Sequence, residues 1–266
     1  MLRILIISDS RGSALQKHIF GSDEFSFPAI EELSKTCSIT IQVFKGATLE
    51  RLENKISNIS KQKYYHLIIL LGGICNLTTV TKERGLKLLH YISDTARTDS
   101  IKHTLTRLDK RYKAQLHIGR IVPACLEGYF EHHNPGKSSP PYLSSQQEQL
   151  NNDLEDLNSF ITSINNNRGQ ERIDLDTKVY KASCKSAKTK GGRRKRAKRQ
   201  VIQKDLLPDG VHPSSELTKK WINRLASVLE KWAENKTTEQ PEISSQESDS
   251  DREPEAWRYK RGPKRP

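Results

Sequence analysis

Two short runs of apolar residues limit what this chain can fold into. The first run is LRILII (2–7) and the second is HLIILL (66–71). A continuous apolar run of this length is typical of a strand buried on both faces, as in parallel sheets covered by helices. The two runs therefore predict central strands of such a sheet.

Other segments alternate between strand and helix patterns. Strands are expected at 38–44, at 115–122 and around 173–180, and helices at 27–35, 84–96, 147–166 and 215–232. This alternation predicts a three-layer α/β/α (flavodoxin-like) fold with a mostly parallel central sheet of about five strands. Ligands of such sheets bind beyond the carboxyl ends of the strands, so the loops that follow the strands are the candidate site.

Composition limits how much of the chain can be folded. Only 34% of the residues are hydrophobic and 29% are charged, which suffices for one core if some segments stay unstructured. We expect one folded domain at 1–233, with a basic, disordered insert at about 185–200 and a disordered charged tail at 234–266. The cysteines are widely spaced, so we expect reduced thiols and no structural metal.

Positive charge is concentrated in KSAKTKGGRRKRAKR (185–199). This segment has nine lysines or arginines, and without them the net charge of +13 falls to +4. Three interpretations stay open: a nuclear-import signal, a phosphate contact to nucleic acid, or a solvated loop. The first two would use a set of side chains that comprises Arg193, Arg194, Lys195, Arg196, Lys198 and Arg199.

The hydropathy of the chain indicates the cellular compartment of the protein. No apolar stretch approaches the roughly 18–20 residues of a membrane span. The opening run is too short for the core of a signal peptide, because Asp9 and Arg11 follow it at once. We therefore expect a cytoplasmic or nuclear protein that is neither secreted nor membrane-spanning.

Polar residues follow each expected strand. SDS (8–10) follows the first, KGAT (45–48) the second and GGICN (72–76) the third, while DGVH (209–212) precedes the last helix. Taken alone, SDS is an ordinary turn and helix cap. Together the four segments supply a serine, an imidazole with a carboxylate three residues earlier, and backbone donors. These are the groups that acyl transfer requires.

In order and approximate spacing, these segments resemble the four sequence blocks of the SGNH (GDSL-type) hydrolases, over residues 1–233 without the basic insert. The resemblance implies that Ser10 is the nucleophile, His212 the general base and Asp209 the residue that orients it. It also implies the backbone N–H groups of Ser10 and Gly46 as oxyanion donors. The expected substrate is a small carboxylic (acyl) ester, with no metal or organic cofactor.

The third block departs from the family pattern. That block normally reads Gly-x-Asn-Asp, and its Asn side chain completes the oxyanion hole. Here an ungapped alignment places Cys75 at the Asn position and Asn76 at the Asp position. A thiol is a weak donor. Either the loop shifts so that Asn76 points into the oxyanion hole, or the enzyme is slow.

A second function therefore stays open. The chain could be a catalytically weak or inactive SGNH-like domain that binds nucleic acid or protein. SGNH-like domains occur in proteins of some LINE-type retroelements, to which a basic insert and a charged tail are similar. Cys75 favours this alternative, whereas the complete set of Ser10, Asp209 and His212 favours the esterase. Residues 123–145, with His132 and His133, are expected to form a long loop beside the pocket.

Overall fold

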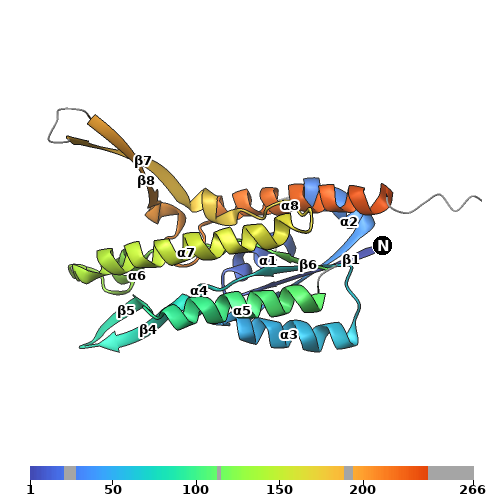
Figure 1. The fold of residues 1–266 in the computed structure, drawn as a ribbon, viewed down its shortest axis with the longest axis horizontal. Coiled ribbons are helices and arrows are strands. Elements are labelled where there is room, and N and C mark those ends of the chain that lie inside the picture. Colours follow the sequence, from blue (N-terminus) through green and yellow to red (C-terminus); the bar gives the residue numbers. More distant parts are fainter. Residues whose placement is uncertain (21–27, 113–114, 189–193, 239–266) are drawn as a thin grey trace, which may run out of the picture.

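A four-stranded parallel sheet lies at the centre of the described structure, a computed structural model that describes residues 1–20, 28–112, 115–188 and 194–238 (Figure 1). Its strand order is β2-β1-β3-β6. The strands are β1 (Leu2–Ser8), β2 (Cys37–Val43), β3 (Leu67–Leu71) and β6 (Leu116–Ile118). The predicted fold class is confirmed, and both apolar runs form central strands.

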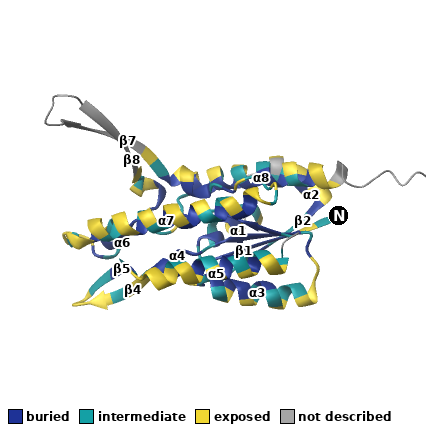
Figure 2. Cartoon of the chain, in the orientation of Figure 1, coloured by how far each residue is buried: buried dark blue, intermediate teal, exposed yellow. Residues whose placement is uncertain are grey.

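The apolar runs are buried because both faces of the sheet are covered. Leu5 and Ile7 on β1 contribute to one core, whereas Ile4 and Ile6 contribute to the other. Successive side chains of a strand point to opposite faces, so an unbroken apolar run serves two cores at once. Figure 2 shows β1 and β3 as largely buried and the outer faces of the helices as exposed.

Helices form the two outer layers. One layer contains α1 (Gly12–Phe20), α2 (Pro28–Thr36) and α8 (Ser215–Thr238). The other contains α3 (Leu49–Gln62), α5 (Thr95–Tyr112), α6 (Leu126–His133) and α7 (Tyr142–Asn166). No helix in the described parts of the chain is both long and apolar enough to cross a membrane. The last helix continues past the expected domain boundary at 233, and residues 239–266 lie outside the described residues.

The helix expected at 84–96 is wrong. Residues of this segment form β5 (Leu86–Tyr91), which pairs in antiparallel fashion with β4 (Thr78–Glu83). Arg84 and Gly85 connect them with φ values of 50° and 80°. Two consecutive residues with positive φ form the type I′ turn that suits a two-residue hairpin loop. The hairpin follows the short helix α4 (Ile74–Leu77) and precedes α5.

Two further expectations fail in the second half of the chain. The segment around 173–180 forms the 3₁₀ helix η1 (Leu175–Val179) instead of a fifth strand of the sheet. The segment 123–145 contains α6 and the start of α7 instead of one long loop. The unstructured insert expected at 185–200 stays a prediction. Residues 185–188 and 194–200 lie on β7 (Tyr180–Lys188) and β8 (Arg194–Ile202), which pair in antiparallel fashion, and residues 189–193 lie outside the described residues. A second 3₁₀ helix, η2 (Lys204–Leu206), follows.

The connections between strands run on opposite faces of the sheet. The chain passes from β1 to β2 through α1 and α2 on one face, and from β2 to β3 through α3 on the other. Since β1 lies between β2 and β3, the connections diverge at the carboxyl end of β1. Such a topological switch point is where ligands bind in open α/β sheets.

Candidate active site

The turn after β1 holds Ser10 at the carboxyl edge of the sheet. The N–H of Asp9 donates a hydrogen bond to the carbonyl of Leu71 on β3 at 3.2 Å, and the chain then turns into α1 at Gly12. A Cβ on Gly12 would lie 2.5 Å from the Cβ of Ser8, so the start of this helix requires a glycine. Ser10 is thereby fixed between strand and helix.

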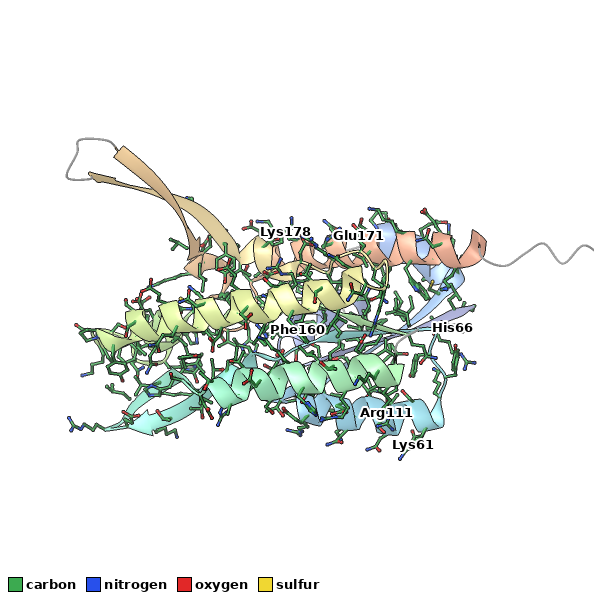
Figure 3. All side chains as sticks on the ribbon, in the orientation of Figure 1. Lys61, His66, Arg111, Phe160, Glu171 and Lys178 are labelled. Carbon is green, nitrogen blue, oxygen red and sulfur yellow. The ribbon has the colours of Figure 1, made fainter. Side chains whose placement is uncertain are left out.

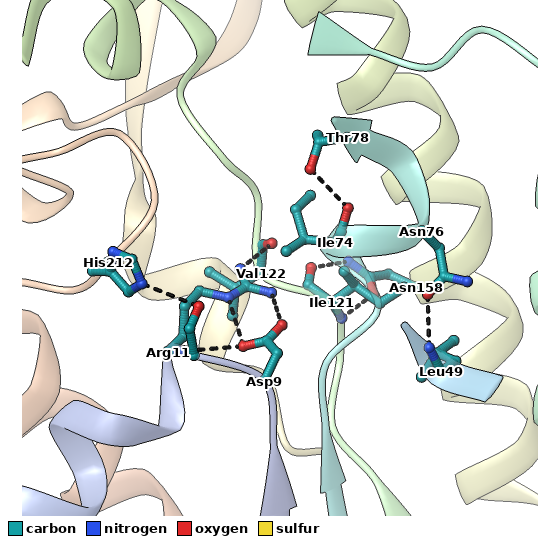
Figure 4. A network of polar contacts seen from close by, with 11 residues as sticks. Asp9, Arg11, Leu49, Ile74, Asn76, Thr78, Ile121, Val122, Asn158 and His212 are labelled. Atoms are coloured by element: carbon teal, nitrogen blue, oxygen red, sulfur yellow. Dashed lines mark hydrogen bonds and ion pairs between the residues drawn. The ribbon is translucent and has the colours of Figure 1, made fainter. Parts of the chain in front are cut away.

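A buried ion pair flanks Ser10 (Figure 4). Arg11 Nη2 donates to Asp9 Oδ2 at 3.1 Å, and Arg11 Nη1 donates to the carbonyl of Val122 at 2.6 Å. The exposed fractions of Asp9 and Arg11 are only 1% and 4%, and buried charges must be paired in this way. The pair ties the Ser10 turn to the segment after β6. The sequence does not predict this pair, because its only signal is an acid and a base two positions apart.

Ser10, His212 and Asp209 form a chain of hydrogen bonds. His212 Nε2 lies 3.0 Å from Ser10 Oγ, and His212 Nδ1 lies 2.6 Å from Asp209 Oδ2. An ionised carboxylate can only accept, so Nδ1 carries the proton and Nε2 is free to accept from the serine hydroxyl. The structure thus brings together residues that are 202 positions apart in the sequence.

The Asp209 carboxylate is stabilised in its ionised form. Burial opposes its charge, but hydrogen bonds from the His212 ring and from the backbone N–H groups of His212 and Val211 outweigh burial. The Asp209 pKa therefore lies well below its ordinary value. Because Oδ1 accepts both backbone N–H groups, at 2.9 Å from Val211 and 2.6 Å from His212, the other oxygen stays aimed at the ring.

Helix α6 positions the loop that carries these two residues. The carbonyl of Gly210 accepts a hydrogen bond from the N–H of Cys125 at 2.7 Å. Gly210 has a φ of 78°, and a Cβ there would lie 2.2 Å from the backbone nitrogen of Tyr129. Both the positive φ and the lack of space for a Cβ require glycine between Asp209 and Val211.

Gly46 lies in the turn after the neighbouring strand. β2 pairs with β1 up to Val43 and Ser8, and the N–H of Phe44 then donates to the carbonyl of Ser8 at 2.8 Å. Gly46 has a φ of 63°, which glycine adopts without strain. Both predicted backbone donors, at Ser10 and Gly46, therefore follow adjacent strand ends at the same edge of the sheet.

The Asn76 side chain is engaged elsewhere. Its Oδ1 accepts a hydrogen bond from the N–H of Leu49 at 2.8 Å, and its Nδ2 donates to Glu50 Oε2 at 2.9 Å. Figure 4 shows Asn76 and His212 on opposite sides of Asp9. Asn76 thus stabilises the start of α3, and the structure does not bring its amide to Ser10.

Cys75 is half-buried beside the Ser10 turn. Burial raises the pKa of its thiol, and the negative charge of Asp9 raises it further, whereas Arg11 acts in the opposite direction. The sulfur is therefore protonated at neutral pH. It can offer at most the weak S–H donor that the sequence predicts.

The other predicted residues are not members of this hydrogen-bonded chain, and one of them lies outside the described residues. His132 and His133 end α6. Arg193 lies outside the described residues, and β8 carries Arg194, Lys195, Arg196, Lys198 and Arg199. Within the described ranges, no group of three or more His, Cys, Asp or Glu side chains could hold a metal ion.

Comparison with known proteins identifies the fold. No family model and no curated protein matches the sequence. Among solved structures, a GDSL-like lipase from Bacteroides thetaiotaomicron is 11% identical, with a TM-score of 0.52 over 88% of each chain. A lipase/acylhydrolase from Enterococcus faecalis is also 11% identical, with a TM-score of 0.51 over 88% of this chain and 97% of its own. The chain therefore has the SGNH (GDSL-type) hydrolase fold.

Proposed function

We propose that this protein is a serine ester hydrolase that acts on small carboxylic (acyl) esters through Ser10, His212 and Asp209. The observation that carries the proposal is the placement of His212, with Nε2 at 3.0 Å from Ser10 Oγ and Nδ1 at 2.6 Å from Asp209 Oδ2. Its location at the switch point of an SGNH fold supports the same function.

The geometry supports a two-step reaction. His212 Nε2 takes the hydroxyl proton as Ser10 Oγ attacks the carbonyl carbon, and the carbonyl oxygen becomes an oxyanion. The backbone N–H groups of Ser10 and Gly46 would stabilise that oxyanion. The C–O bond to the alcohol then breaks, and the alcohol takes the proton from His212. Water, activated by the same ring, releases the acid and restores Ser10.

The structure of the third block bears on the rate. Loss of one oxyanion donor costs roughly 10²–10³ in turnover in a well-studied protease. Asn76 is engaged with α3 and Cys75 offers only a thiol, so we propose an esterase that is slow by this margin.

Labelling with a fluorophosphonate tests the proposal. The probe phosphonylates an activated serine, so we expect the wild type to be labelled and both Ser10→Ala and His212→Ala to stay unlabelled. Ser13→Ala, a nearby serine on α1, is the matched control and should label like the wild type. A folded wild type that stays unlabelled at high probe concentration would contradict the esterase.

A second candidate function depends on the basic segment. The nine positive charges of 185–199 favour an anionic partner, and we propose nucleic acid bound through its phosphates. Binding to single- and double-stranded oligonucleotides would be measured between 50 and 200 mM salt. We expect affinity to fall steeply with salt, and deletion of 185–199 to abolish that dependence. Salt-dependent binding that survives the deletion would place the contact elsewhere.

A further inference from the structure

A cluster of basic side chains lies beside the loop that holds Asp209 and His212. Its members, called here the basic cluster, are Lys82, Lys87, His132 and His133. They come from the β4–β5 hairpin and from the end of α6, two elements joined by Asn134. The Asn134 side chain accepts from the N–H of Lys87 at 2.9 Å and donates to its carbonyl at 2.8 Å.

The basic cluster is built around the Tyr129 ring. Lys87 Nζ lies 5.5 Å from the centroid of that ring, and the His133 ring lies 4.3 Å from it, centroid to centroid. The His132 and His133 rings are 4.8 Å apart. Tyr129 thus holds the ammonium of Lys87 and the imidazole of His133 on one side of α6.

The same tyrosine contacts the catalytic loop. A Cβ on Gly210 would lie 2.2 Å from Tyr129 N and 2.7 Å from Tyr129 Cα, so the backbone of α6 packs directly on the residue after Asp209. The charge of Asp209 also acts on the pKa of His133, which burial, Lys87 and His132 lower. The basic cluster and Asp209 are therefore electrostatic neighbours.

Asp209 acts on His133, but no carboxylate in the described part of the chain pairs with the two lysines of the cluster. Lys82 and Lys87 are direct cross-strand partners, and like charges in this arrangement are destabilising. Among the described residues, neither lysine forms an ion pair. The nearby acids of α6 face elsewhere, because Glu127 and Glu131 bind Lys204 at 3.5 and 2.7 Å. Two neighbouring lysines without an ion-pair partner are suited to bind an anion.

We propose that the basic cluster binds a negatively charged group on the alcohol portion of the ester, with Lys87 as its main contact. The inference rests on the proposed esterase function. His212 gives its proton to the departing alcohol, and the cluster adjoins the loop that carries His212, so the alcohol side of the substrate is the side it can reach. The substrate class is an ester of an anionic alcohol, with a carboxylate or phosphate group.

Two fluorogenic esters test this specificity. 7-Acetoxycoumarin is neutral, and 7-acetoxycoumarin-3-carboxylate carries the negative charge on the leaving group. We expect Lys87→Gln to lower the ratio of kcat/KM for the charged over the neutral ester about fivefold, the factor of one exposed ion pair. Lys87→Arg keeps the charge and should restore the ratio. Lys61→Gln, at the end of α3 away from the hairpin, is the matched control (Figure 3).

The two esters test the anion site separately from the proposed esterase function. A ratio that is the same in Lys87→Gln and wild type would exclude the anion site while leaving ester hydrolysis intact. If neither ester is hydrolysed, binding of the fluorescent product 7-hydroxycoumarin-3-carboxylate decides instead. A Kd that rises about fivefold in Lys87→Gln supports the site, and an unchanged Kd contradicts it.

Discussion

For Asn76, the sequence and the structure indicate different roles. As an oxyanion donor it would act on the rate, whereas its bonds to Leu49 N–H and Glu50 act on the fold. Asn76→Ala leaves a buried backbone N–H unsatisfied, so we expect the free energy of unfolding in urea to fall by about 1–3 kcal/mol. Labelling of the folded fraction should change little. A rate loss of about 10²–10³ with unchanged stability would instead place the amide in the oxyanion hole.

A substitution of Asp209 tests the proposed role of His212 as general base. Asp209→Asn retains the size of the side chain but can donate to His212 Nδ1, which favours the tautomer that cannot accept from Ser10. We expect ester hydrolysis to fall by roughly 10⁴, the order seen for this change in a serine protease. Asp205→Asn, an exposed carboxylate on η2, should keep full activity. Equal activity in both variants would contradict the role of Asp209.

At the scale of elements, α6 determines the position of the loop that carries Asp209 and His212. A methyl group on Gly210 would collide with the Tyr129 backbone and would also occupy a positive φ. We expect Gly210→Ala to lower ester hydrolysis more than tenfold and stability by about 1–3 kcal/mol. Gly169→Ala is the matched control, since its φ is 67° and no atom lies within 4 Å of its Cβ. It should lower stability by about 1–2 kcal/mol through strain alone and leave hydrolysis unchanged.

The elements that were predicted correctly are those in which one signal dominates. The strands β1 and β3 are unbroken apolar runs, and α7 has an apolar stripe of Leu150, Leu154 and Leu157. Leu86, Leu88 and Leu89 fit a helical spacing equally well, and the Arg84-Gly85 turn decided for a hairpin. The leucine spacing alone did not distinguish a helix from a strand there, because strand formation depends on contacts with the neighbouring strand.

The site was predictable only in part for a related reason. Ser10 and Gly46 follow strand ends, and Asp209 and His212 lie in the loop before the last helix, so their position can be derived from chain order and topology. Pairings between distant side chains have no such signal. The contact of Arg11 with the Val122 carbonyl and that of Asn76 with Leu49 depend on packing that a single sequence does not encode locally.

At the scale of the whole molecule, two buried groups on the same side of the sheet respond to acid in opposite ways. Burial lowers the pKa of His117 from 6.5 to about 4, against the carbonyl of Glu171. Burial also raises the pKa of Asp176 from 3.8 to about 6, although Arg120 opposes that rise. Below pH 6.5 the unfolded chain gains a proton that buried His117 does not, so this group makes stability fall as pH falls.

Asp176 has the opposite sign. Its folded form binds the proton more tightly than the unfolded chain, so its contribution to stability is fully present below pH 3.8 and is lost as pH rises through 6. We expect Asp176→Asn to remove this loss. The stability of the variant minus that of the wild type should rise by about 2 kcal/mol between pH 4 and 6, which is most of the about 3 kcal/mol that the whole pKa shift corresponds to at about 1.4 kcal/mol per unit.

Urea unfolding at several pH values in this range measures that difference directly. Asp205→Asn, an exposed carboxylate, should give a difference that stays flat with pH. His117→Asn should change the wild-type profile in the opposite direction, because it removes the group that favours high pH. If the Asp176→Asn difference is flat, Asp176 is ionised when folded and its bond to Arg120 at 3.1 Å outweighs its burial. The two groups would then no longer offset each other, and the wild type would lose stability steadily below pH 6.5.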